Sequence, residues 1–277
     1  MDPTLRPSRH LTLTGACLAA ALAALSAIAA THGLWKIFVI GWVSFGAMLV
    51  GAAIGAYVRP SARGIIWAYG LASGAMLTSA TLDLVPLGVQ LDPELAGVGI
   101  AAGLVAGYIL DTAGGSARQS GTLDTSTLRL TAHAVTAGVA IGSIYAMLPG
   151  IGLLLGLSII SHKGPAGYAA ARRLAATGRT PAVLVIPAAG LGIPAMIVSL
   201  IQPSLPVSVN AVIVGLSAGI FLHFAFDFLP REEHREHGRE DADAYAGARA
   251  QPVVWPHGVM STVLGAAAVA IAWFLVT

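Results

Sequence analysis

Polar breaks divide this chain into nine apolar segments, and each is about as long as a helix of about 20 residues that crosses a lipid bilayer. The breaks are proline, glycine, arginine or acidic clusters, which are typical of helix ends. Charged residues make up 10% of the chain, whereas a soluble domain carries about 25%. The sequence therefore predicts an all-α, polytopic membrane helix bundle with nine transmembrane helices. The predicted spans are residues 11–30, 35–57, 64–88, 93–112, 127–148, 151–171, 181–201, 207–229 and 254–276.

Breaks that contain basic residues alternate along the chain with breaks that contain none. Thirteen of the fifteen Lys and Arg residues fall at every second break, and only Lys36 and Lys163 do not. The thirteen are Arg6, Arg9, Arg59, Arg63, Arg118, Arg129, Arg172, Arg173, Arg179, Arg231, Arg235, Arg239 and Arg249. Because cytoplasmic loops carry the excess of Lys and Arg, this alternation predicts a cytoplasmic N-terminus and a C-terminus on the outside.

The first span stands apart from the others. Its apolar part covers residues 11–30, which is longer than the 7–15 residues of an ordinary signal-peptide core. We therefore expect it to be retained, although small residues near its end leave cleavage open. The predicted organisation is a segment at 1–34 with a cytoplasmic start and an extra transmembrane helix, followed by a core at 35–277. The single cysteine, Cys17, cannot form an internal disulfide.

Two stretches share the pattern His-x-x-x-Ala-Gly inside apolar runs. One begins at His133 and ends at Gly138, and the other begins at His162 and ends at Gly167. The second stretch also contains Lys163. A lysine at the centre of a membrane helix costs roughly 2.5–3.5 kcal/mol, so such residues usually mark a pathway or a ligand site. These two spans are where the sequence places the functional centre.

The third and eighth spans share a second pattern. Each contains Gly-x-x-Leu followed by Asp-x-x-Pro, at residues 74–86 in one span and 219–230 in the other. The predicted topology makes these two spans run in opposite directions. Inverted repeats of this kind are a transporter architecture with the binding site at the repeat interface. The two aspartates of the pattern, Asp83 and Asp227, are candidate pathway residues.

Together, these segments resemble the ZIP (Zrt/Irt-like) family of divalent-metal transporters over residues 35–277. The stretch at 162–167 matches the His, Pro and Gly of the motif in the family's fifth helix, and the stretch at 133–138 matches the His and Gly of the fourth. The segment at 73–77 resembles the part of the second helix that supplies a methionine. The resemblance implies an eight-helix core with inverted repeats, preceded here by one extra helix. It also implies a bacterial inner-membrane location, with the lipid bilayer and a small inorganic cation as partners and with a homodimer as a candidate assembly.

The departures from the family pattern concern its metal ligands. The places of an asparagine and several acids of a two-metal centre are occupied by Ala134, Ala137, Lys163, Ala166 and Ile193. Because hard and borderline cations need oxygen or imidazole donors, the second metal position cannot exist. What remains for the first position is His133, His162 and Met76, which are the predicted metal ligands of a single site.

Lys163 has three interpretations. Its charge could replace that of the lost metal, burial could let it exchange a proton, or its stem could reach water, which a position near mid-helix makes difficult. His223 is either a polar group in the pathway or a buried histidine with a local partner. Asp83 and Asp227 are either pathway groups or helix-end residues paired with arginine or solvent.

Two functions are consistent with these residues. The first is a divergent ZIP-like secondary transporter for a metal cation, Zn-like or soft, through a single site. The alternative is a ZIP-fold membrane protein that has lost divalent-metal transport and moves another solute or acts as a regulator or scaffold. No phosphate-binding GxxxxGK[ST] motif is present. Any transport is therefore expected to be secondary or facilitated. We also expect no enzyme activity, no nucleic-acid partner and no cofactor other than a transported or bound metal ion such as Zn.

Overall fold

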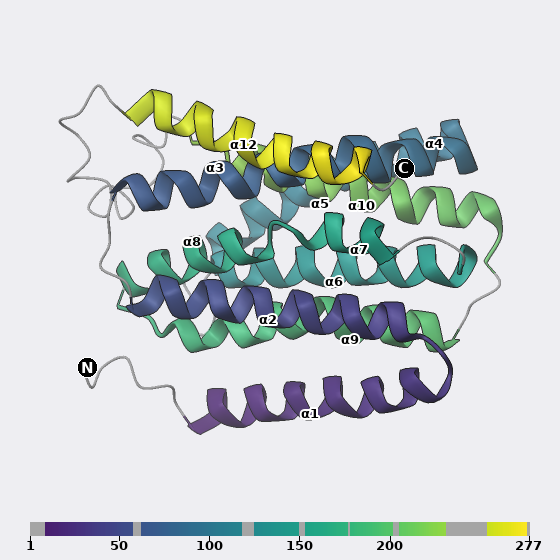
Figure 1. Ribbon diagram of the computed structural model, residues 1–277, viewed down its shortest axis with the longest axis horizontal. Helices are drawn as coiled ribbons and strands as arrows, with labels where there is room; N and C mark the ends of the chain where they lie inside the picture. Colours follow the sequence, from purple (N-terminus) through teal and green to yellow (C-terminus); the bar gives the residue numbers. More distant parts are fainter. Residues whose placement is uncertain are drawn as a thin grey trace.

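The computed structural model describes residues 9–57, 62–117, 125–149, 153–176, 178–201, 205–230 and 254–275, and every regular element in these ranges is a helix. The helices run side by side along one axis of an elongated bundle (Figure 1). The longer helices are α1 (Arg9–Thr31), α2 (Trp35–Tyr57), α3 (Ala62–Ser79), α5 (Pro93–Ala117), α6 (Thr125–Met147), α9 (Val185–Ile201), α10 (Val207–Asp227) and α12 (Val254–Phe274). The shorter elements are η2 (Ala80–Leu84), α4 (Val85–Leu91), α7 (Leu153–Ile160), α8 (Lys163–Ala176) and η4 (Pro181–Leu184).

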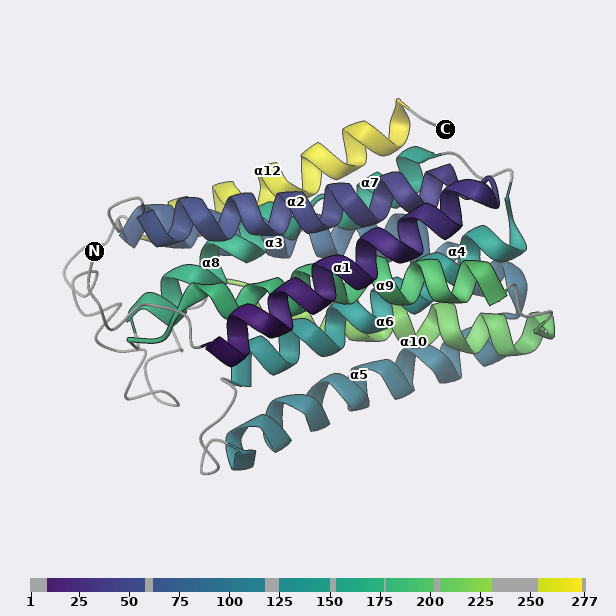
Figure 2. The same ribbon diagram turned by 90° about the horizontal axis from the view of Figure 1, so that it is seen from below.

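Eight helices in the described ranges are long and apolar enough to cross a membrane. The all-helical bundle is thus confirmed, but the count of nine spans is not. The difference lies in the predicted span 151–171, which is divided between α7 and α8. Neither piece alone has the length of a transmembrane helix. The two pieces follow one another along the bundle axis in both views (Figures 1 and 2).

The interruption between α7 and α8 falls at Ser161 and His162. Pro165 explains it, because a proline has no N–H to donate to the carbonyl four residues earlier and its ring crowds that carbonyl. In the first turn of a new helix the missing N–H costs nothing, and Pro165 is the third residue of α8. Gly164-Pro165 was a visible signal for this break, and the sequence-based spans overlooked it.

A second irregularity lies in the third span. Residues Ala80–Leu84 form one π-helical turn between α3 and α4, and Asp83 is buried on that turn. Pro86 stands in the first turn of α4. A proline here removes one backbone donor, and π-helical turns often accommodate such a mismatch.

Successive spans begin at opposite ends of the bundle. In Figure 1, α1, α3, α6, α9 and α12 begin at the end where the N-terminus lies, and α2, α5, α7 and α10 begin at the other end. This arrangement agrees with the alternation of basic residues along the chain, provided that α7 and α8 are taken as one crossing.

The helices pack in two groups. In the first, α2 packs against α8 and α9, α6 packs against α9, and α1 lies on the outside against α9. In the second, α10 packs against α5, α3 packs against α12, and α4 lies against α10. The groups meet mainly where α3 touches α8 and where α10 touches α6. The two His-x-x-x-Ala-Gly stretches belong to the first group and lie at this seam.

Small residues bring the helix backbones close together, as is common in lipid. A β-carbon on Gly51 of α2 would overlap the carbonyl oxygen of Gly164 in α8, and one on Gly219 of α10 would overlap the carbonyl oxygen of Ile100 in α5. By contrast, a β-carbon on Gly46 of α2 would meet nothing within 4 Å. The approach at Gly51 fixes the height of α8 beside α2.

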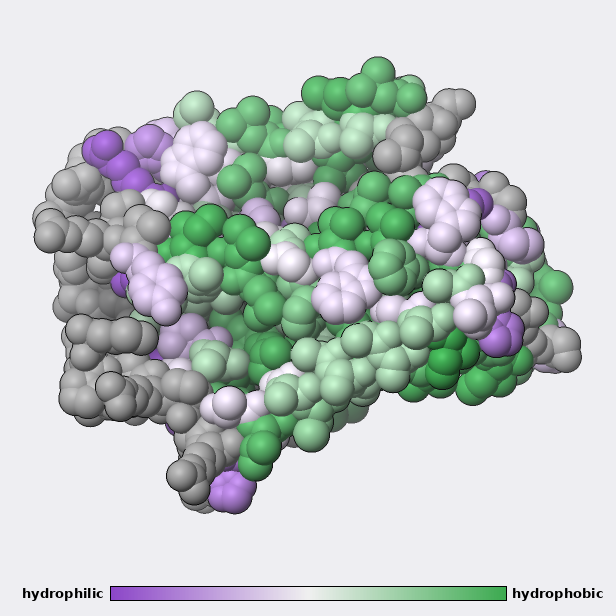
Figure 3. Space-filling view, turned by 60° about the horizontal axis from the view of Figure 1, so that its bottom comes forward, coloured by the Kyte–Doolittle hydropathy of each residue, from purple (hydrophilic) through white to green (hydrophobic). Residues whose placement is uncertain are grey.

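The outer surface of the bundle is apolar. Large side chains such as Val98, Tyr108 and Val263 are more than half exposed. On the face shown in Figure 3, apolar residues cover much of the described surface between the ends, and hydrophilic residues lie towards the ends. A band of this kind suits a bilayer.

We predict that Gly51→Ala destabilises the protein by roughly 1–3 kcal/mol, because the added methyl group has no room against the α8 backbone. Gly46→Ala is the matched control on the same helix. It should leave stability unchanged or raise it slightly, since alanine favours a helix over glycine. Thermal unfolding of the purified protein in detergent measures both. Equal effects of the two substitutions would contradict the close approach of α2 and α8.

Candidate functional site

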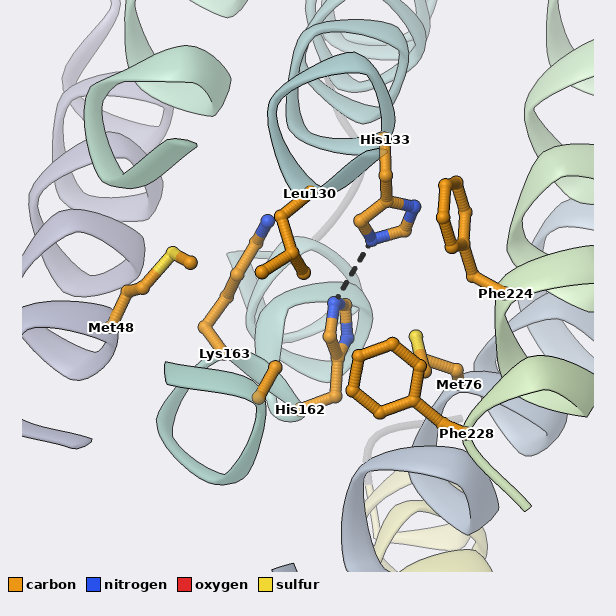
Figure 4. A pocket seen from close by; sticks show the side chains of 9 residues that line it. Met48, Met76, Leu130, His133, His162, Lys163, Phe224 and Phe228 are labelled. Atoms are coloured by element: carbon orange, nitrogen blue, oxygen red, sulfur yellow. Dashed lines mark hydrogen bonds between the residues drawn. The ribbon is translucent and has the colours of Figure 1, made fainter. Parts of the chain in front are cut away.

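His133 and His162, which the sequence predicted as ligands of a single site, face one another. His133 projects from α6, and His162 sits in the interruption between α7 and α8. Their Nε2 atoms lie 3.2 Å apart, within hydrogen-bonding distance (Figure 4). Both side chains are buried, with exposed fractions of 2% and 1%. The pair therefore connects α6 to the helix break in the interior of the bundle.

Aromatic rings of α10 enclose the pair. The ring centre of Phe221 lies 4.5 Å from that of His133 and 5.5 Å from that of His162. The Phe224 ring lies 5.1 Å from the His133 ring. Phe221 and Phe224 lie one turn apart on one face of α10, and Phe228, which directly follows the helix, continues the i, i+3, i+7 spacing. That spacing was visible in the sequence but was not recognised as a wall of the site.

The hydrogen bond between the histidines needs one Nε2 to donate and the other to accept, which fixes opposite tautomers. Whichever tautomer His133 adopts, its Nδ1 is then a buried donor or acceptor, and it has no hydrogen-bond partner among the described residues. A buried polar atom without a partner costs about 1–3 kcal/mol. The unpaired Nδ1 offsets much of the stability that the hydrogen bond between the histidines contributes, so a purely structural role explains the pair poorly.

Lys163 shares the same cavity. It is the first residue of α8, only 2% of its surface is exposed, and its side chain extends towards the helix that carries Leu130 and His133 (Figure 4). None of the residues that line the cavity with it is an acid, and Asp83 and Asp227 are not among them. A buried ammonium without a partner is costly, which makes Lys163 the least expected residue of the site.

The cavity between these side chains is small, about 10 Å³, which is close to the least volume that holds one water molecule. Met76 lies on its His162 side and Met48 on its Lys163 side (Figure 4). The lining residues are Met48, Met76, Leu130, His133, His162, Lys163, Ala166, Phe224 and Phe228. Sequence reasoning missed Met48, Leu130 and the two phenylalanines, since only the packing of α2, α6 and α10 around the helix break brings them here.

The other predicted pathway residues do not line this cavity. His223 faces α5 instead, where its ring covers Gly107. Asp83 is buried on the π-helical turn, and Asp227 is the half-buried last residue of α10. The structure therefore brings together His133, His162, Lys163 and Met76, and it leaves His223, Asp83 and Asp227 outside.

The two Nε2 atoms are suitably spaced for one metal ion. Two nitrogens at 2.0–2.1 Å from a tetrahedral metal lie about 3.3 Å apart, close to the separation observed here. The remaining donors of the lining are thioethers and an amine, and no group of three or more His, Cys, Asp or Glu residues in the described ranges could hold a metal. Such a donor set suits a soft cation and does not suit Mg²⁺, Mn²⁺ or Ca²⁺.

The fold and the apolar helices define an α-helical integral membrane protein. No known family model matches the chain, and no curated protein sequence matches it.

We predict that the two histidines are energetically coupled. His133→Leu or His162→Leu alone leaves the partner's Nε2 buried without its hydrogen bond and should destabilise the protein by about 1–3 kcal/mol. The double substitution removes both polar groups and should cost less than the sum of the two single changes. Thermal unfolding of the four proteins in detergent gives the coupling energy. If the destabilisation of the double variant equals the sum of the two single effects, the two rings do not interact in the detergent-solubilised protein.

Proposed function

We propose that this protein is a divergent ZIP-like secondary transporter that moves one metal cation at a time through the His133–His162 cavity. The observation that carries the proposal is the pair of imidazole nitrogens 3.2 Å apart, in a water-sized cavity at a helix break. A cavity of this size has room for one monatomic ion and excludes an organic solute. Broken helices at mid-membrane depth are a frequent site of ion binding in transporters.

The donor atoms favour a soft cation. Imidazole suits both zinc and copper, and the thioethers of Met48 and Met76 favour Cu(I). The lining offers no carboxylate, which hard cations require. We therefore propose Cu(I) first and Zn²⁺ second as the cargo.

The position of the cavity supports a transport mechanism. His133 and His162 come from one group of helices, and Met76, Phe224 and Phe228 come from the other. A movement of one group against the other would open the cavity to one side of the membrane and then to the other. The phenylalanines of α10 would act as the wall that closes it.

The orientation of the protein is also proposed. The arginines at every second break along the sequence support a cytoplasmic N-terminus and an outside C-terminus, in a bacterial inner membrane. The homodimer predicted from the sequence stays a prediction.

Lys163 favours a second candidate function. Two unit charges about 5 Å apart in an environment of effective dielectric constant near 20 repel by roughly 3 kcal/mol, and a divalent ion doubles that. A charged Lys163 in the cavity wall therefore opposes a divalent cation more than a monovalent one. The alternative is a ZIP-fold membrane protein that has lost divalent-metal transport and moves another solute or acts as a regulator or scaffold.

We predict opposite accessibility for two exposed positions. In a Cys17→Ser background, His32→Cys lies at the turn between α1 and α2, and Arg179→Cys lies between α8 and η4. In intact cells a membrane-impermeant thiol reagent should label the cysteine at position 32, whereas labelling at position 179 should require permeabilised cells. The reverse pattern would invert the proposed orientation.

We predict saturable Cu(I) uptake by proteoliposomes that contain the purified protein, with slower Zn²⁺ uptake and no Mn²⁺ uptake. His162→Leu removes one of the two imidazole donors and should lower Cu(I) uptake by at least about tenfold. His32→Gln changes an exposed histidine at the end of α1 and should leave uptake unchanged.

Three results would count against the proposal. If no metal enters the vesicles, the second candidate function is favoured. If Mn²⁺ enters as fast as Cu(I), the donor set has been misread, and if His162→Leu transports normally, the pathway lies elsewhere in the bundle.

A further inference from the structure

The first turn of α8 faces the cavity. His162 immediately precedes this helix, Lys163 opens it, and Ala166 completes the turn, and all three line the cavity. The amide of Ala166 donates to the carbonyl oxygen of His162, at 3.0 Å. The N–H groups of Lys163 and Gly164 belong to the first turn, where a helix has no internal acceptors to offer. The N-terminus of a helix of 14 residues therefore lies beside a cavity in the interior of a membrane protein.

A helix N-terminus carries a partial positive charge and attracts anions. Here the residue at that end is itself a cation, so the helix dipole and the Lys163 ammonium repel one another. Lys163 is 2% exposed, and none of the residues that line the cavity with it is an acid that could balance its charge. Buried lysines at membrane depth otherwise pair with acids or carbonyls. The site has an excess of positive charge that the described part of the chain does not neutralise.

The other residues that line the cavity carry no negative charge that could offset the positive charge of Lys163. None of the nine lining residues is an acid. Ala166 occupies the position one turn after His162 on the same face of α8, and its methyl group leaves room in the cavity. The cavity is at the lower size limit for one water molecule, so an oxyanion with three or four oxygens does not fit, and a halide ion fits only if the surrounding side chains move slightly apart.

We infer that this cavity is a binding site for a single small monovalent anion such as chloride, held by the Lys163 ammonium at the N-terminus of α8. The anion is the counter-ion that the buried lysine lacks. Binding of this anion does not require that the protein transports a metal. Where the proposed function holds, the same anion offsets the repulsion between Lys163 and the cargo and provides a third ligand beside the two imidazoles.

The test uses the purified full chain in detergent, with a chelator present to remove metals. Chloride or bromide replaces gluconate at constant ionic strength, and both radioactive chloride binding by equilibrium dialysis and the unfolding temperature are measured. We expect saturable binding of one chloride per chain and a higher unfolding temperature in chloride. Lys163→Met should weaken chloride binding roughly 10- to 100-fold, since it removes a charge-assisted contact, and Lys163→Arg should largely retain it.

Lys36→Met is the matched control. Lys36 lies in the first turn of α2, does not line the cavity and donates to the carbonyl oxygen of Pro149, so its loss should leave chloride binding unchanged. Absence of saturable chloride binding by the wild-type protein would overturn the inference, even if Lys163→Met cannot be purified. Equal loss of binding in Lys163→Met and Lys36→Met would also overturn it, because the effect would then be one of overall charge.

The two proposals fail separately. If Cu(I) uptake is the same in chloride and in gluconate and no chloride binds, the anion site is wrong and the transport proposal stands. If chloride binds through Lys163 but no metal is transported, the anion site stands and the transport proposal is wrong.

Discussion

Within a bilayer every backbone N–H and C=O group needs a partner inside the protein, and an uninterrupted helix is the simplest way to provide one. The chain follows this constraint along eight long helices and departs from it most sharply between α7 and α8. There Pro165 stops the helix, and the freed polar groups gather with His162, Lys163 and the imidazole of His133. The position of the site is thus a consequence of where the helix has to break. The phenylalanines of α10 then keep lipid and bulk water away from the polar groups.

Packing of small residues determines which side chains meet at this break. The α2 and α8 backbones come so close at Gly51 and Gly164 that neither helix can slide along the other without a clash. One turn before Gly51, Met48 is therefore carried to the cavity wall beside Lys163. The glycines contribute nothing to the chemistry, but their spacing sets the register of the residues that do.

The sequence predicted the fold more fully than the site. Long apolar runs predicted most helices well, and the predicted span 35–57 coincides with α2, because length and hydropathy alone decide these elements. The break at His162 was missed because the spans were assigned on length and apolar composition, and the Gly164-Pro165 signal was not weighed against them. Facing histidines could be expected from the two matching stretches, but the position of His223 against α5 could not. Which face of α10 meets which neighbour depends on backbone contacts between distant segments, and no local pattern encodes them.

The sign of charge in the cavity links its two proposed occupants. Two imidazoles spaced for one metal ion invite a cation, while Lys163 and the α8 N-terminus oppose it. The imidazole pair favours a cation in the cavity, and the positive charge beside it disfavours one, so the two features conflict when no other ion is present. A monatomic anion between them removes the conflict, because it pairs with the ammonium and shields the metal from it.

The cavity could not hold both particles at its observed size, so loading would have to widen it. The only seam available for that movement in the described structure is the contact between the two helix groups, where His133 and His162 face Phe221 and Phe224. Binding of the ions and separation of the two helix groups would then occur together. A transporter needs this coupling between ligand binding and conformational change.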